Sequence, residues 1–370
     1  MPEKANIRFP VAQPDIRDKD IERVSQDLLA GNVSGGAPTI REAETSLSSI
    51  ISSECLLVAN GSVAIILALR ALGIGNNDEV IVPNLTYAAT ASSVVNVGAI
   101  PIFCDSDETD WNISLQAAMH ARTSRTRAII LVDLYGVTRD WSPMVKWARS
   151  EGLAIIHDCA ESLTSSWRGG PTGAFADVRT YSFFANKLVT SGEGGAVATA
   201  DQSLLKKMRI LRGQGMSETM RYWFDVPGYN FRMSSLQASL LLSQLERLPE
   251  TSTNRDELFA RYDKLLKGVA TRPMPPEGGY FSPWMYTVAL VDLKPLELAR
   301  SLAKLGVETR PVFYPLTSMP AFSSYHVEGN DRVAAKLNKV GISLPTWTQW
   351  TESNWGDLAQ AIESSINELR

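Results

Sequence analysis

The strongest constraint on the fold is an alternation of short apolar runs with helical patterns between about residues 55 and 200. The runs are rich in Val and Ile and lie at 79–83, 99–104, 128–134 and 153–158. Near-continuous apolar runs of this kind are typical of strands buried on both faces, and they predict a mainly parallel sheet. Helical patterns at 62–72, 88–97 and 143–149 separate the runs and are expected to cover that sheet. The sequence therefore predicts an α/β fold, in which ligands bind beyond the carboxyl ends of the strands.

The pattern changes after Pro249. Helical patterns at 257–266, 296–305 and 355–369 there separate short strand-like stretches at 284–291 and 307–313. We therefore expect a large domain at 1–248 and a smaller α+β domain at 249–370. Before the change, the helix expected at 234–248 carries an apolar stripe wider than one core-facing side needs. It is either a subunit interface or a buried connecting helix.

Composition excludes several classes of function. A net charge of −4 without a basic run gives no footprint for nucleic acid or for a membrane surface. The three cysteines have unrelated spacings and the three histidines do not cluster, so neither disulfides nor a metal site is expected. Residues 1–5 lack the pattern of a signal peptide, and no apolar run approaches membrane-spanning length. The expected location is cytoplasmic.

One lysine stands in an unusual local context. Lys187 ends the segment Tyr-Ser-Phe-Phe-Ala-Asn-Lys, which contains Ser182, and a glycine-rich turn follows at 191–195. Asp158 ends a predicted buried strand shortly upstream. An amine for a Schiff base, donors for a phosphate and a carboxylate for a pyridinium nitrogen are what an enzyme needs to hold pyridoxal phosphate (PLP). Without such neighbours, Lys187 would be read as a solvated surface lysine.

Further candidates follow the predicted strands or begin helices. Gly61 and Ser62 stand directly before an apolar helix, where free N–H groups either bind an anion or make an ordinary capped start. Tyr87 could lie flat against a planar ring, or it could be a core aromatic. Glu161, three residues after Asp158, could hydrogen-bond the phenolic oxygen of the cofactor.

Two later segments contribute polar side chains. Asn230 and Arg232 lie just ahead of the apolar helix at 234–248 and are either functional or ordinary surface residues. Arg310 carries a guanidinium suited to a carboxylate or a phosphate, and Tyr314 follows it in the same segment. We take Arg232, Arg310 and Tyr314 as candidates for substrate binding.

Taken together, these segments resemble the DegT/DnrJ/StrS sugar aminotransferases, which are fold-type-I PLP enzymes. The resemblance extends from about residue 7 to 369 and rests on six segments in order, at 60–62, 83–90, 158–161, 182–187, 192–195 and 228–233. It implies a PLP-binding domain with a mainly parallel sheet and a smaller C-terminal domain. It also implies that Lys187 forms the Schiff base and moves protons, that Asp158 pairs with the pyridine nitrogen, and that Tyr87 stacks on the ring.

The resemblance implies the remaining contacts as well. Gly61, Ser62 and Ser182 would hold the phosphate, and Glu161 would contact the ring oxygen. Asn230 would reach the phosphate of the neighbouring subunit, which implies a homodimer with shared active sites.

Within the family, the segments at 182–187, 213–217 and 308–315 are most similar to the GDP-perosamine synthase group. Those enzymes aminate GDP-4-keto-6-deoxy-mannose with glutamate as donor. Dehydratases of the same fold carry a histidine at the position of Lys187, which argues against that activity. An aminotransferase for a UDP- or TDP-linked 3- or 4-ketosugar, and a non-catalytic regulatory subunit of the same fold, remain as alternatives.

Overall fold

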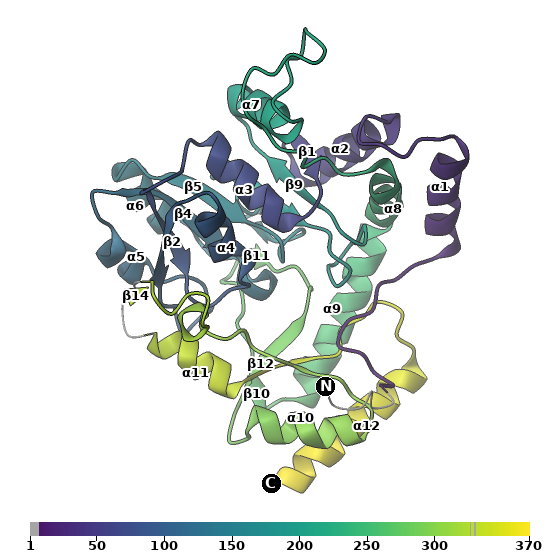
Figure 1. Ribbon diagram of the computed structural model, residues 1–370. Helices are drawn as coiled ribbons and strands as arrows, with labels where there is room; N and C mark the ends of the chain where they lie inside the picture. The colour runs from purple at the N-terminus through teal and green to yellow at the C-terminus, as the bar shows by residue number, and fades with distance from the viewer. Residues whose placement is uncertain (1–6, 326, 329–330) are drawn as a thin grey trace.

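The computed structural model describes residues 7–325, 327–328 and 331–370 (Figure 1). Its centre is an eight-stranded sheet. The order of its strands is β1 (Cys55–Val58), β9 (Gly195–Ala198), β8 (Val178–Ser182), β5 (Ala154–Asp158), β4 (Thr126–Val132), β2 (Glu79–Pro83), β3 (Ile100–Cys104) and β14 (Val327–Glu328). Strand β9 runs antiparallel to both of its neighbours, and the other pairs are parallel. The predicted α/β fold with a mainly parallel sheet is confirmed. Residues 1–5, on which the signal-peptide expectation rests, lie outside the described residues.

Alternate side chains of the central strands enter cores on opposite faces of this sheet. Val80 and Val82 of β2 belong to a core that includes α3 (Gly61–Ala71) and α4 (Ala89–Asn96). Ile81 points into another core, under α5 (Leu115–Ala121) and α6 (Ser142–Ser150). All three side chains are fully buried. Burial on both faces explains why these strands read as continuous apolar runs.

Four helices of the N-terminal part lie at the end of the large sheet that contains the antiparallel strands β1 and β9. They are α1 (Asp18–Leu29), α2 (Pro38–Ile51), α7 (Gln202–Arg212) and α8 (Ser235–Glu246). Helix α8 packs against α1 and α2, and Leu241 and Leu245 lie in the core beneath them. The helix is therefore largely buried within the chain, while a role in a subunit interface stays a prediction.

A second, four-stranded antiparallel sheet organises the C-terminal part. Its order is β10 (Ala270–Thr271), β12 (Tyr286–Leu290), β15 (Gly341–Leu344) and β13 (Arg310–Pro311). Four helices accompany it: α9 (Leu248–Leu265), α10 (Pro295–Lys304), α11 (Arg332–Val340) and α12 (Glu352–Leu369). The strand expected at 307–313 is wrong in part, because Val307 pairs with Phe9 outside this sheet. A small third sheet joins β11 (Gly279–Tyr280), β6 (Ser166–Trp167) and β7 (Gly170–Pro171).

Two segments cross between the N-terminal part, up to residue 248, and the C-terminal part that follows it. The N-terminal segment 8–17 donates from Val11 N–H to Glu308 and pairs Arg17 with Glu250. In the other direction, β14 adds to the edge of the large sheet beside β3. A division into domains at residue 248 stays a prediction. No helix among the described residues is long and apolar enough to span a membrane.

Candidate active site

The end of β5, the first turn of α4 and the neighbouring strand β8 bring the predicted acid and its hydroxyl partners together. Asp158 is the last residue of β5 and is 7% exposed. Thr90 Oγ1 donates to its Oδ2 at 3.1 Å, while Thr180 Oγ1 and Ala160 N–H donate to its Oδ1 at 3.3 and 3.2 Å. Burial raises the pKa of Asp158, although these donors and the charge of Lys187 oppose that shift. Asp158 is therefore a buried side chain fixed by three hydrogen-bond donors.

Lys187 is held in a largely buried position after β8. Its side chain is 13% exposed, and a small cavity around it is lined by Glu161, Ser182 and Trp284 among others. Burial lowers the pKa of Lys187, while the charges of Glu161 and Asp158 raise it. A buried amine with a lowered pKa is more often neutral, which is the form that attacks a carbonyl carbon.

Glu161 completes an acid–base pair with the lysine. Its Oε1 lies 4.0 Å from Lys187 Nζ. Its Oε2 accepts a hydrogen bond from Tyr135 N–H at 2.6 Å. Burial raises the pKa of Glu161 to about 7, against the opposing effect of Lys187. Burial thus brings the pKa of this carboxylate and the pKa of this amine closer together, which favours proton exchange between the two groups.

Two aromatic residues of this site were missed in the sequence. The Trp284 ring lies 3.9 Å from Lys187 Nζ, and its Nε1–H donates to the carbonyl of Asn186 at 2.9 Å. The Tyr135 ring stacks between Trp284 and Phe313, with interplanar angles of 15° and 14°. Trp284 and Phe313 come from segments distant from Tyr135 in the sequence, and no local motif indicates that these rings meet.

The start of α3 lies beside Ser182 of the lysine segment. Asn60 caps the helix by accepting from Val63 N–H at 3.0 Å, which leaves the N–H groups of Gly61 and Ser62 without an intrahelical partner. A Cβ placed on Gly61 would lie 2.9 Å from Ser182 Cβ. Only glycine allows this approach, and it brings a helix N-terminus and a hydroxyl to one place. Such an arrangement suits a phosphate.

Tyr87 lies between β2 and α4 and is 63% exposed. Its ring faces Phe313 at 6.0 Å with a tilt of 57°. It is not a core aromatic, and one side of the ring is open.

The remaining predicted residues lie outside the lysine cluster. Asn230 is exposed and accepts from Arg232 Nε at 3.3 Å, and Arg232 pairs with the end of β1 through Val58. The Arg310 side chain is 58% exposed and binds Glu308, which also accepts from the N-terminal segment. Tyr314 is exposed beyond β13.

The residues present fit pyridoxal phosphate. Lys187 offers a desolvated amine, Asp158 a carboxylate fixed by three donors, and the α3 N-terminus with Ser182 a cradle for phosphate. These three features lie together on the side of the sheet where the carboxyl ends of β5, β8 and β1 are found.

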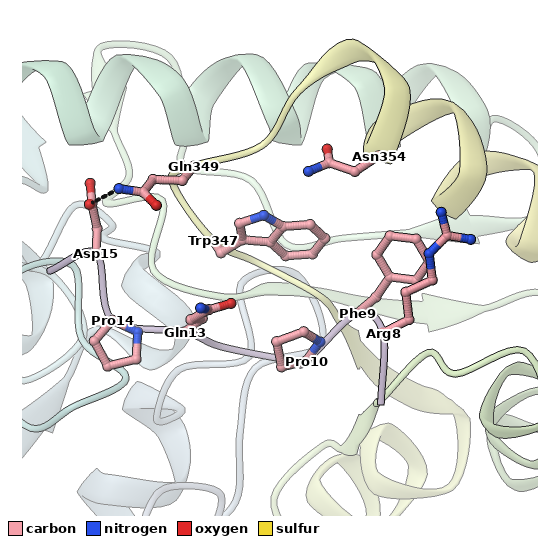
Figure 2. Close-up of a pocket in the computed structure, with 9 residues that line it drawn as sticks. All are labelled: Arg8, Phe9, Pro10, Gln13, Pro14, Asp15, Trp347, Gln349 and Asn354. Atoms are coloured by element: carbon pink, nitrogen blue, oxygen red, sulfur yellow. Dashed lines mark hydrogen bonds between the residues drawn. The ribbon is translucent and has the colours of Figure 1, made fainter. Parts of the chain in front are cut away.

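A larger cavity of about 260 Å³ lies elsewhere, between the N-terminal segment and the C-terminal part. Figure 2 shows Trp347 at its centre, Phe9 beside Arg8 on one side, and Gln349 bonded to Asp15 on the other. Three amide side chains, those of Gln13, Gln349 and Asn354, line it together with Arg8. It contains none of the predicted site residues, and its amides and rings supply neither a nucleophile nor an acid–base pair.

Comparisons with known proteins agree with this geometry. Residues 14–363 match the DegT/DnrJ/EryC1/StrS aminotransferase family. The GDP-perosamine synthase of Caulobacter vibrioides is 39% identical over 83% of this chain and 84% of its own. The GDP-perosamine synthase of Escherichia coli O157:H7 is 36% identical over 92% of this chain and 93% of its own. A crystal structure of a DegT/DnrJ/EryC1/StrS aminotransferase from Brucella abortus, 29% identical, covers 94% of this chain and 95% of its own with a TM-score of 0.88.

Proposed function

The chain belongs to the DegT/DnrJ/EryC1/StrS aminotransferase family, and from that premise we propose that it moves the amino group of glutamate to GDP-4-keto-6-deoxy-mannose, giving GDP-perosamine. The chain is a PLP-dependent sugar aminotransferase. The observation that carries the proposal is the cluster of Lys187, Glu161 and Asp158 at the strand ends. The names of the two GDP-perosamine synthases support the choice of sugar nucleotide.

We propose that the residues of this edge hold the cofactor in three places. The N–H groups of Gly61 and Ser62 and the hydroxyl of Ser182 would bind the phosphate, Asp158 the ring nitrogen, and Glu161 the ring oxygen. Tyr87 would cover the open face of the ring. When bound, PLP supplies a carbonyl carbon that carries the amine and a ring that accepts an electron pair.

Lys187 performs the proton transfers in this proposal. In the first half of the reaction its Nζ would take a proton from the α-carbon of glutamate and pass it to the cofactor. Water would then release 2-oxoglutarate, with the amino group left on the cofactor. In the second half it delivers a proton to the sugar carbon that carried the carbonyl group. Glu161 would accept or return a proton at Lys187 Nζ, which the distance of 4.0 Å and its raised pKa of about 7 support. Asp158 keeps the proton on the ring nitrogen.

We further propose a homodimer in the cytoplasm, with Asn230 reaching the partner's site. The exposed segment 213–230 supports this proposal, because it carries apolar side chains that a monomer would leave in water. They are Met220, Tyr222, Trp223 and Phe224, each more than half exposed. Asn230 ends the same segment and is exposed. We also propose Arg232, Arg310 and Tyr314 as substrate contacts. Because Arg310 forms an ion pair with Glu308, a bound sugar nucleotide would have to displace that carboxylate from Arg310.

Product analysis tests the substrate directly. Purified protein with PLP, glutamate and GDP-4-keto-6-deoxy-mannose should form 2-oxoglutarate and a GDP-linked amino sugar in equal amounts, measured by mass spectrometry. Parallel reactions with UDP- and TDP-linked 4-ketosugars should be much slower. Turnover of only those substrates would contradict the GDP-sugar proposal, and no turnover of any of them would favour a non-catalytic role.

A further inference from the structure

The backbone of Tyr135 adopts a conformation that its side chain does not favour. Tyr135 lies in the short 3-10 turn η1 (Leu134–Gly136) after β4, and its φ of +53° is in the left-handed region. Residues other than glycine, asparagine and aspartate rarely adopt this region. The residue is 4% exposed, so the surrounding structure must hold it there.

Three contacts hold this conformation. The Tyr135 ring lies between the rings of Trp284 and Phe313, at centroid distances of 6.0 and 5.2 Å. Its hydroxyl accepts from Phe313 N–H at 3.1 Å. On the backbone side, a Cβ on Gly136 would meet the Ser282 carbonyl oxygen at 2.2 Å, so the turn is packed closely against the segment that carries Trp284.

This backbone conformation directs the N–H group of Tyr135 toward the carboxylate of Glu161. Tyr135 N–H donates to Glu161 Oε2 at 2.6 Å, while Oε1 of the same carboxylate faces Lys187 Nζ. We propose that Tyr135 is a positioning residue, whose left-handed backbone, locked by the stack on Trp284 and Phe313, orients the Glu161 carboxylate toward Lys187. The inference rests on the proposed function of Lys187, and it adds a residue for which the sequence motifs gave no role.

The hydrogen bond also sets the protonation of the pair. The charged and titratable groups facing Glu161 are Lys187, Asp158 and the Tyr135 hydroxyl. Tyr135 N–H favours the carboxylate form of Glu161, because a hydrogen bond donated to a charged oxygen stabilises the charge. With PLP bound, the titrating groups are the Glu161 carboxylate and the Schiff-base nitrogen of Lys187. Loss of the Tyr135 donor should move the lower titration midpoint of these two coupled groups to higher pH.

Two substitutions separate the backbone from the ring. Tyr135→Val removes the ring and disfavours a positive φ, since β-branched residues are least tolerant of it. Tyr135→Asn also removes the ring, but asparagine tolerates the left-handed region. Tyr262→Val is the matched control: Tyr262 is buried and stacked on Tyr286, with its hydroxyl bonded to the carbonyl of Pro345, and it lies in the core of the C-terminal part.

The test is a pH titration of the absorbance of bound PLP in the native protein and the three variants, with thermal melting to confirm folding. Tyr135→Val should raise the lower midpoint by about one to two pH units, the effect of one lost hydrogen bond to a charged group. Tyr135→Asn should recover most of that shift, and Tyr262→Val should lower the melting temperature without moving the midpoint. A native midpoint in Tyr135→Val, or an equal shift in both Tyr135 variants, would overturn the proposal. The readout needs no sugar, so a native protein that binds PLP without aminating the GDP-sugar would contradict the proposed substrate alone.

Discussion

Lys187 owes its proposed reactivity to the side chains around its amine. Burial lowers the pKa of this amine, and the charges of Glu161 and Asp158 limit that shift by favouring the charged form. The sequence motif around Lys187 predicted the residue and its partners Asp158 and Glu161, because they follow recognisable strand ends. It could not predict Tyr135 and Trp284, whose contacts depend on the tertiary stack.

Replacement of Lys187 by alanine tests its proposed role in proton transfer. Lys187→Ala should reduce kcat by about 100-fold or more, because it removes the proposed proton-transfer group. Melting curves should show that the variant still folds, since the substitution removes a buried amine whose charged form is costly there. Native rates in Lys187→Ala would reject the assignment of this site.

Glu161 makes the stability of the cofactor-free protein depend on pH. Its folded pKa is raised from 4.5 to about 7, so the folded state binds a proton that the unfolded chain has lost in this range. Stability from this group is therefore complete below pH 4.5 and is lost as the pH rises through about 7. Glu161→Gln should remove this component, which is on the order of 1–3 kcal/mol. Urea unfolding at several pH values measures it, and identical pH slopes in the variant and the native protein would contradict the assignment.

At the scale of elements, the site is made by the ends of strands and the start of one helix. Strands β2, β4 and β5 were predicted within two residues of their observed ends, because burial on both faces leaves a clear apolar signal. The antiparallel strands β1 and β9 were not identified, since four residues give little periodicity. Helix α9 begins at Leu248, well before the predicted start at 257, because Pro249 fits the first turn of a helix as well as it fits a break.

The close approach of α3 to β8 gives a prediction at this scale. Gly61→Ala would place a methyl group 2.9 Å from Ser182 Cβ and should weaken PLP binding on the order of tenfold by displacing the proposed phosphate cradle. Gly356→Ala in α12 is the matched control: its new methyl group meets nothing within 4 Å, and it should raise stability by about 0.5–1 kcal/mol. Absorbance titration with PLP measures the first effect. Equal affinities in the two variants would show that the α3 start does not bind the phosphate.

At the scale of the whole molecule, the two parts are connected by exchanged segments. The N-terminal segment binds the C-terminal part through Phe9 and Val11, and β14 returns to the large sheet. The sequence indicates a change in the pattern of helices and strands near residue 249. It does not indicate that these segments cross between the two parts, because pairing between short segments distant in the sequence leaves no local signal. The sequence of segment 213–230 mixes polar and apolar residues, so it does not show that the aromatic side chains there are exposed.

Sharing of active sites between subunits can be tested by mixing inactive variants. Lys187→Ala and Asn230→Ala should each be inactive or strongly impaired as homodimers. If the partner's Asn230 completes each site, a dimer of the two variants contains one intact site, and subunit exchange should restore part of the activity. Size-exclusion chromatography with light scattering would confirm dimers before and after mixing. No recovery after demonstrated exchange would mean that Asn230 acts within its own subunit.

The most direct test of the central claim is the position of the cofactor bond. The native protein would be incubated with PLP, reduced with borohydride, digested and examined by peptide mass spectrometry, with Lys187→Ala treated in parallel. The account predicts one labelled peptide that carries the cofactor on Lys187, and no label at that peptide in the variant. A label on another lysine, or specific labelling that persists in Lys187→Ala, would contradict it.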